Sequence, residues 1–194
     1  MATFKELTAY YHNLEAAFKR TEETYYFNND RSHNATVMRF MFDNAKQVNM
    51  YCGELSVLRE RFYDHIGKDS GEEDAGKVKD AMIKSLKDFF DKPDSKLTVV
   101  FESYSDEIFD DMICKDLFIS KLKENIISFY KLDETFSFKA DINHFCYTDS
   151  GITRFEVDKM LHNAICTFHN RTYSDACEKN FQILLKLAKN TTFN

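Results

Sequence analysis

The stretch NHFCYTDSGITRFE, residues 143–156, contains the strongest local signal for the fold. Apolar side chains recur on both sides of Asp149-Ser150-Gly151, and a short segment of Asp, Ser and Gly between two such runs is typical of a β-hairpin turn. The stretch therefore predicts two antiparallel strands, at 143–147 and 152–157.

Helical and strand patterns surround this hairpin. We expect two helices before residue 47, then strand, helix, helix, strand, helix, a run of short strands and a closing helix. The other predicted strands are 48–52, 97–101, 127–130, 136–138 and 164–168. This order predicts the α/β class: a mixed β-sheet flanked by helices, with early strands parallel through right-handed crossovers and later strands partly antiparallel.

An apolar stripe marks the N-terminal segment and predicts an amphipathic helix. We expect residues 1–46 to form a helical extension packed on the core, and residues 47–194 to form the α/β domain, as one compact unit. The stripe could instead form a seam between two chains or receive a protein partner. Its members, at spacings of three and four, are Phe4, Leu7, Tyr11, Leu14 and Phe18.

The composition is that of a folded domain, with 43% hydrophobic residues and one proline in 194 residues. The 5 glycines are too scattered to build a Walker phosphate loop or a dinucleotide fingerprint. A net charge of -6 disfavours a general polyanion-coating role. Binding of nucleic acid is not excluded, but no unbalanced basic surface indicates it.

The cysteines predict buried, reduced thiols, because they are 5 in number and form no Cys-x-x-Cys pair. No histidine or cysteine spacing is typical of a zinc site, so we expect no metal and no cofactor. The N-terminus lacks the apolar core of a signal peptide, and no apolar run is long enough to cross a bilayer. We therefore expect a cytoplasmic protein without membrane contact.

From residue 47 onward, the order of elements and the histidine of the quoted strand resemble a half-domain of the phospholipase D superfamily, whose corresponding strand bears H-x-K-x4-D. In that family the histidine attacks phosphorus, the lysine neutralises phosphate oxygens and the aspartate tunes the histidine. Only His144 matches. Cys146 stands in the lysine position and Gly151 in the aspartate position, while Asp149 comes two residues early. The resemblance implies a degenerate site and, because members with one half-domain usually pair, a homodimer.

The second strand of the hairpin contains charged residues that are further candidates. Arg154 is a substitute for the missing cation, since arginine grips phosphate or carboxylate with two parallel hydrogen bonds. Arg154 and Glu156 share one face of the strand. They form either a solvated ion pair at a sheet edge or a polar binding cluster with His144 and Asp149.

Two acidic residues, Glu54 and Glu102, each follow a predicted strand. Ligands of open α/β sheets collect at the carboxyl ends of strands, where two carboxylates can bind a metal or act as acid and base. The alternative is that both stabilise the N-termini of adjacent helices.

Three functional hypotheses follow. The first is a non-catalytic binding or interaction module on a degenerate phospholipase-D-like scaffold. The second is a divergent nuclease or phosphodiesterase with His144 as nucleophile, Arg154 as cation and Asp149 as orienting group. The third is a subunit of a larger assembly, such as a phage-defence or mobile-element system, recognised through the N-terminal helices.

Overall fold

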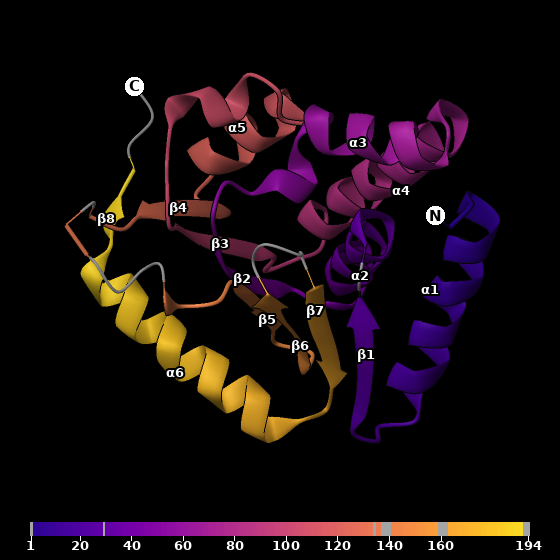
Figure 1. The fold of residues 1–194 in the computed structure, drawn as a ribbon. Coiled ribbons are helices and arrows are strands. Elements are labelled where there is room, and N and C mark those ends of the chain that lie inside the picture. Colours follow the sequence, from indigo (N-terminus) through magenta and orange to yellow (C-terminus); the bar gives the residue numbers. More distant parts are fainter. Residues whose placement is uncertain (1, 29, 134, 137–140, 159–162, 192–194) are drawn as a thin grey trace.

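A single mixed sheet runs through the computed structural model in the order β1-β7-β6-β5-β2-β3-β4-β8 (Figure 1). Its strands are β1 Thr24–Asn28, β2 Gln47–Cys52, β3 Lys96–Phe101, β4 Ile127–Lys131, β5 Phe145–Thr148, β6 Ile152–Asp158, β7 Asn163–Phe168 and β8 Lys189–Asn190. The helices are α1 Phe4–Lys19, α2 Arg31–Asn44, α3 Glu60–Ser70, α4 Glu72–Phe90, α5 Lys115–Lys123 and α6 Arg171–Leu187, with short 3-10 turns η1 Ser56–Leu58 and η2 Asp106–Phe109. The structure describes residues 2–28, 30–133, 135–136, 141–158 and 163–191.

The strand directions match the predicted mixed sheet. Strands β2, β3 and β4 are parallel neighbours, whereas β5 is antiparallel to β2 and begins the antiparallel series β5-β6-β7-β1. The β5-β6 hairpin is confirmed, and Gly151 has the positive φ of 82° that its turn requires. The strand predicted at 136–138 lies in part outside the described residues.

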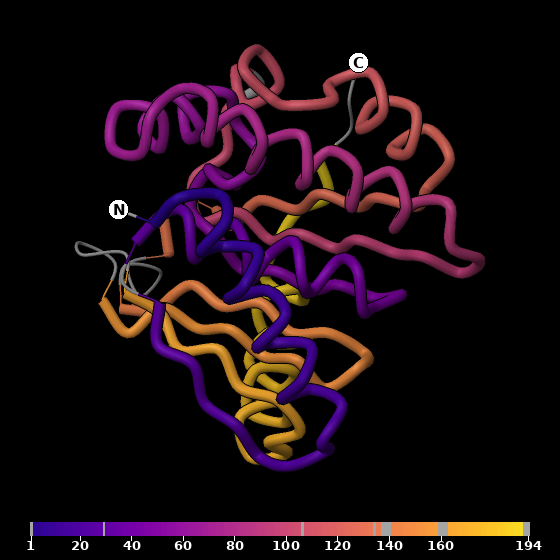
Figure 2. Tube along the Cα trace, turned by 90° about the vertical axis from the view of Figure 1, so that its right-hand side faces the viewer, coloured from indigo at the N-terminus to yellow at the C-terminus, as the bar shows by residue number. Residues whose placement is uncertain are grey.

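The two faces of the sheet bury different helices. In β3, Val99 and Phe101 point into the larger core with α1 to α5, while Val100 points into a smaller core beneath α6. This alternation is the two-residue period of a strand covered on both faces. Figure 2, seen from the side of α1, shows α1 in front of the strands and α6 behind them.

The N-terminal stripe packs on the chain's own core rather than facing outward. Leu7 is 3% exposed and Leu14 is 0% exposed. The segment 1–46 was predicted as purely helical, but residues 24–28 form edge strand β1, which pairs with β7. Its sequence, TYYFN, has high β propensity, but only the tertiary pairing with β7 distinguishes so short a strand from a loop. No helix among the described residues is long and apolar enough to span a bilayer.

Lys92 closes the C-terminal end of α2 from the loop after α4. Its Nζ donates to the carbonyl oxygens of Phe42, Asp43 and Ala45 at 2.8, 2.7 and 2.9 Å. These carbonyls lie at the end of the helix, where oxygens lack partners within the helix.

We predict that Lys92→Met lowers the free energy of unfolding by about 1–3 kcal/mol, because three half-buried acceptors lose one charged donor. Urea denaturation measures the change. Lys179→Met, on the exposed side of α6, is the matched control and should stay within about 0.5 kcal/mol of the wild type. Equal effects of the two substitutions would contradict this role of Lys92.

Candidate functional site

The site lies where the carboxyl ends of β2 and β3 meet the beginning of β5. Because β5 is antiparallel to β2, with Tyr51 opposite Phe145, the residue before β5 lies beside the end of β2. His144 is that residue. Glu102 directly follows the neighbouring strand β3, so the topology brings its carboxylate to the same edge of the sheet.

His144 is held between two carboxylates. Its Nε2 lies 2.6 Å from Glu102 Oε2, and its Nδ1 lies 2.8 Å from Glu156 Oε2. Glu156 faces His144 across the hairpin, where its amide also donates to the His144 carbonyl at 2.8 Å. A carboxylate accepts hydrogen bonds and cannot donate them, so both contacts are made together when each ring nitrogen donates an N–H.

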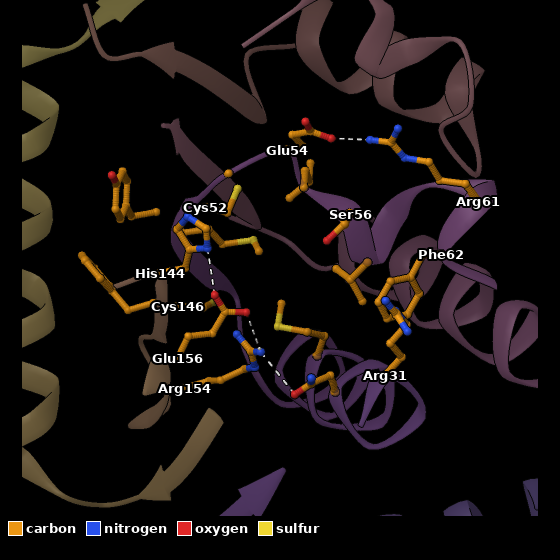
Figure 3. Close-up of a pocket in the computed structure, with 18 of the residues that line it drawn as sticks. Arg31, Cys52, Glu54, Ser56, Arg61, Phe62, His144, Cys146, Arg154 and Glu156 are labelled. Atoms are coloured by element: carbon orange, nitrogen blue, oxygen red, sulfur yellow. Dashed lines mark hydrogen bonds and ion pairs between the residues drawn. The ribbon is translucent and has the colours of Figure 1, made fainter. Parts of the chain in front are cut away.

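Arg154 extends this cluster along β6. The hairpin register places it opposite Cys146, which lies two residues after His144. Its Nη2 donates to Asn34 Oδ1 at 3.2 Å and to Glu156 Oε1 at 3.4 Å (Figure 3). The residue is 9% exposed, and its buried Nε has no hydrogen-bond partner. Arg154 and Glu156 therefore form a buried cluster with His144 rather than a solvated edge pair.

The environment of Glu156 favours its ionised form. Burial by itself raises the pKa of this carboxyl group, but the hydrogen bond from His144 and the positive charge of Arg154 outweigh it, so its pKa lies below the ordinary value of 4.5. The cluster of Glu102, His144, Glu156 and Arg154 thus joins two carboxylates, an imidazole ring and a guanidinium group through hydrogen bonds.

A cavity of about 360 Å³ opens beside this cluster, between the sheet and the helices α2 and α3. His144, Arg154 and Glu156 lie on one side of it, and Arg31 and Phe62 lie on the opposite side (Figure 3). Its volume falls within the range of small-molecule sites. The apolar and sulfur-containing part of the lining comprises Met38, Met50, Tyr51, Cys52, Leu55, Val57, Phe62, Phe145 and Cys146.

Gly53 allows the histidine ring to approach the end of β2. A Cβ atom at this position would lie 3.2 Å from His144 Cε1 and 3.5 Å from Nε2. The first distance is closer than an ordinary van der Waals contact, so a larger residue would require the ring to shift by a few tenths of an ångström.

The other predicted site residues lie elsewhere. Asp149 accepts from the amides of Lys46 and Gln47 at 3.0 Å, at the opposite end of β5 from His144, so the turn does not bring it back to the ring. Glu54 lines the cavity, but its carboxylate is paired with Arg59 and Arg61 at the start of α3. The carboxylate of Glu54 therefore pairs with arginines instead of capping a helix N-terminus. It also does not lie with Glu102 in the cluster around His144.

The thiols of the cavity are unsuited to nucleophilic chemistry. Burial raises the pKa of Cys52 to about 12 and that of Cys146 well above its ordinary value. Within the part of the chain that the structure describes, no three His, Cys, Asp or Glu side chains are arranged to hold a metal ion.

Sequence reasoning missed two members of the site. Asn34 binds Arg154 from 120 residues away, and no local pattern connects the two positions. Gly53 is the second, since its lack of a side chain gives the His144 ring room. The signal available in the sequence was a glycine placed directly after a buried strand, where backbone must approach another group closely.

No protein-family model and no curated protein matches this chain. Among solved structures, TrmBL2, reported as an archaeal chromatin protein with a novel mode of DNA binding, superposes with a TM-score of 0.55 at 11% identity. The match covers 96% of this chain, which spans 65% of the TrmBL2 chain. Nuc from Salmonella typhimurium, a phospholipase D family member, gives a TM-score of 0.51 at 9% identity over 89% of this chain and 99% of that chain. NucT from Helicobacter pylori gives 0.50 at 10% identity over 88% and 99%. The fold is therefore phospholipase-D-like.

The lowered pKa of Glu156 predicts a pH-dependent stability. A carboxyl group with a depressed folded-state pKa stabilises the fold above its unfolded-state pKa of about 4.5 and loses that contribution as the pH falls through the folded-state value. Between about pH 6 and about pH 3, the free energy of unfolding of the wild type should therefore fall more steeply than that of Glu156→Gln. Urea denaturation at each pH measures both, with exposed Glu22→Gln as the control. Parallel curves for the wild type and Glu156→Gln would contradict the stabilisation of ionised Glu156 by His144 and Arg154.

Proposed function

We propose that this protein is a non-catalytic binding module, in which a degenerate phospholipase-D-like site has become a ligand cavity. One observation carries the proposal: each ring nitrogen of His144 contacts a carboxylate oxygen, Glu102 on one side and Glu156 on the other. A nucleophilic histidine needs an unshared electron pair on the attacking nitrogen. With an N–H on each nitrogen, His144 has none to direct at phosphorus.

The surrounding charges support the same conclusion. A phosphodiester approaching His144 Nε2 would need to take the place of the Glu102 carboxylate, 2.6 Å away, and would be repelled by it. In the family's lysine position, Cys146 is buried and uncharged. Cys146 therefore supplies no positive charge of the kind that stabilises a phosphoryl transition state.

The fold accommodates such a role. TrmBL2, which shares the fold, is reported as a chromatin protein that binds DNA, so a binding function on this scaffold has a structural precedent. A cavity of about 360 Å³ with an apolar lining favours a small molecule as the ligand here.

A second candidate is a divergent phosphodiesterase. The observation in its favour is the cross-strand position of Arg154, which brings a guanidinium group next to the missing lysine. Against it, Nη2 of this arginine is already bonded to Asn34 and Glu156. The homodimer implied by the resemblance stays a prediction, which the mass of the protein in solution would test.

We predict that the wild type and His144→Ala hydrolyse a fluorogenic phosphodiester and labelled single-stranded DNA at the same background rate. The reason is that His144 cannot act as a nucleophile while both nitrogens are engaged. His65→Ala is the matched control, because His65 lines the same cavity from α3. Turnover that falls at least about tenfold in His144→Ala but persists in His65→Ala would establish the phosphodiesterase instead.

A further inference from the structure

We propose that strand β1 is the contact surface for a second copy of this chain, which pairs with it antiparallel about a two-fold axis and continues the sheet from one subunit into the next. The resemblance to the phospholipase D superfamily implies a homodimer but names no interface. The proposal goes beyond the ligand cavity, which no residue of β1 lines. It follows from the open edge of the sheet, the aromatic side chains exposed there and their order along the strand.

The two edges of the sheet are built differently. Its outer strands are β1 and β8 (Figure 1). An edge strand presents unpaired backbone N–H and C=O groups, and proteins protect such edges with very short strands, charged side chains or proline. Strand β8 has two residues, one of which is Lys189. Strand β1 has five, Thr-Tyr-Tyr-Phe-Asn, without charge or proline, and among the described residues it pairs with β7 alone. Only the β1 edge therefore lacks these protections.

Strand β1 also exposes large apolar side chains. Phe27 is 70% exposed and Tyr25 is 46% exposed, and the strand period places both on one face of the sheet. Phe27 lies opposite Ile165 of β7, which lies opposite Phe155 of β6, and Phe155 packs against the smaller core beneath α6. This row extends the apolar face from that core to the edge of the sheet. Exposed aromatic side chains of this kind are typical of protein interfaces.

The strand is held in place before any partner arrives. The Tyr25 hydroxyl accepts a hydrogen bond from Asn170 Nδ2 at 2.6 Å, and its ring meets the Tyr173 ring edge-on, with centroids 6.2 Å apart. On the opposite face, the Tyr26 hydroxyl donates to the carbonyl oxygen of Asn13 in α1 at 3.2 Å. A strand fixed from both faces loses little conformational freedom when another strand pairs with it.

The order of the side chains selects a second copy as the partner. A two-fold interface joins a surface to itself, so that surface has to be self-complementary. With the axis at Tyr26, each Tyr25 lies opposite the partner's Phe27, and the two rings form a cross-strand aromatic pair on one face. The pairing is confined to residues 24–27, because Asn28 is fully buried.

The charges of the chain are compatible with this contact. The protein has a net charge of -6, so most surfaces of two copies repel each other. Residues 24–27 contain no acidic side chain, and pairing them places no two carboxylates opposite each other. The uncharged edge is therefore a surface at which two acidic copies can meet.

Sedimentation velocity between about 1 and about 100 µM protein tests the inference. The wild type should form a species of twice the 22.9 kDa mass of one chain. Phe27→Glu should raise the dissociation constant of the dimer at least about tenfold, because it replaces an aromatic contact with a charge. Ile183→Glu, at a 49% exposed apolar position on α6, is the matched control and should leave the constant unchanged.

Hydrogen exchange of the wild type locates the contact without a substitution. Backbone amides of β1 that point away from β7 exchange readily in a single chain and become protected when a second strand pairs with them. Peptides that cover residues 24–28 should gain protection as the protein concentration rises, whereas peptides that cover β8 should not.

Three results would overturn the proposal: a wild type that stays monomeric throughout the concentration range, a Phe27→Glu variant that dimerises as tightly as the wild type, or a dimer without added protection of residues 24–28. None of them concerns turnover or the cavity, so the proposed function fails separately, through hydrolysis that depends on His144.

Discussion

The imidazole ring of His144, fixed between the carboxylates of Glu102 and Glu156, is the interaction on which the account of this site depends. It engages both ring nitrogens, one with each carboxylate. It also keeps Glu156 ionised, and Glu156 in turn bonds Arg154. The sheet supplies this geometry: the antiparallel entry of β5 beside β2 brings the ring to the carboxyl ends of the parallel strands, and Gly53 leaves room for it.

The hairpin was predictable because its signals are local. The turn residues and the alternation of residues 143–156 determine its register, and that register puts Glu156 opposite His144. The contacts of Glu102 and Asn34, 42 and 120 residues from their partners, could not be predicted, since only the folded sheet and α2 bring them together. Asp149 was assigned to the site by its sequence spacing, but a strand rises by about 3.3 Å per residue, which carries its two ends apart. Strand β1 was not predicted, because a five-residue segment at a sheet edge forms a strand only when a neighbouring strand, here β7, pairs with it.

The position of Arg154 bears on both proposed functions. The hairpin register places it opposite Cys146, and its Nη2 is bonded to Glu156 and Asn34. Beside it lies a cavity at the usual edge of an α/β sheet, lined mainly by apolar side chains. The engagement of both nitrogens of His144 beside this cavity supports our proposal of ligand recognition over transfer of a phosphoryl group.

The most direct measurement is ¹⁵N NMR of the histidine side chains at neutral pH, with His144 assigned by comparison with His144→Asn. The account predicts that both ring nitrogens of His144 are protonated, each with the chemical shift of an N–H donor to a carboxylate, and that Glu102→Gln or Glu156→Gln changes the shift of the nitrogen it faces. A neutral ring with one unprotonated nitrogen on the side of Glu102 would contradict it, because that nitrogen could then attack phosphorus.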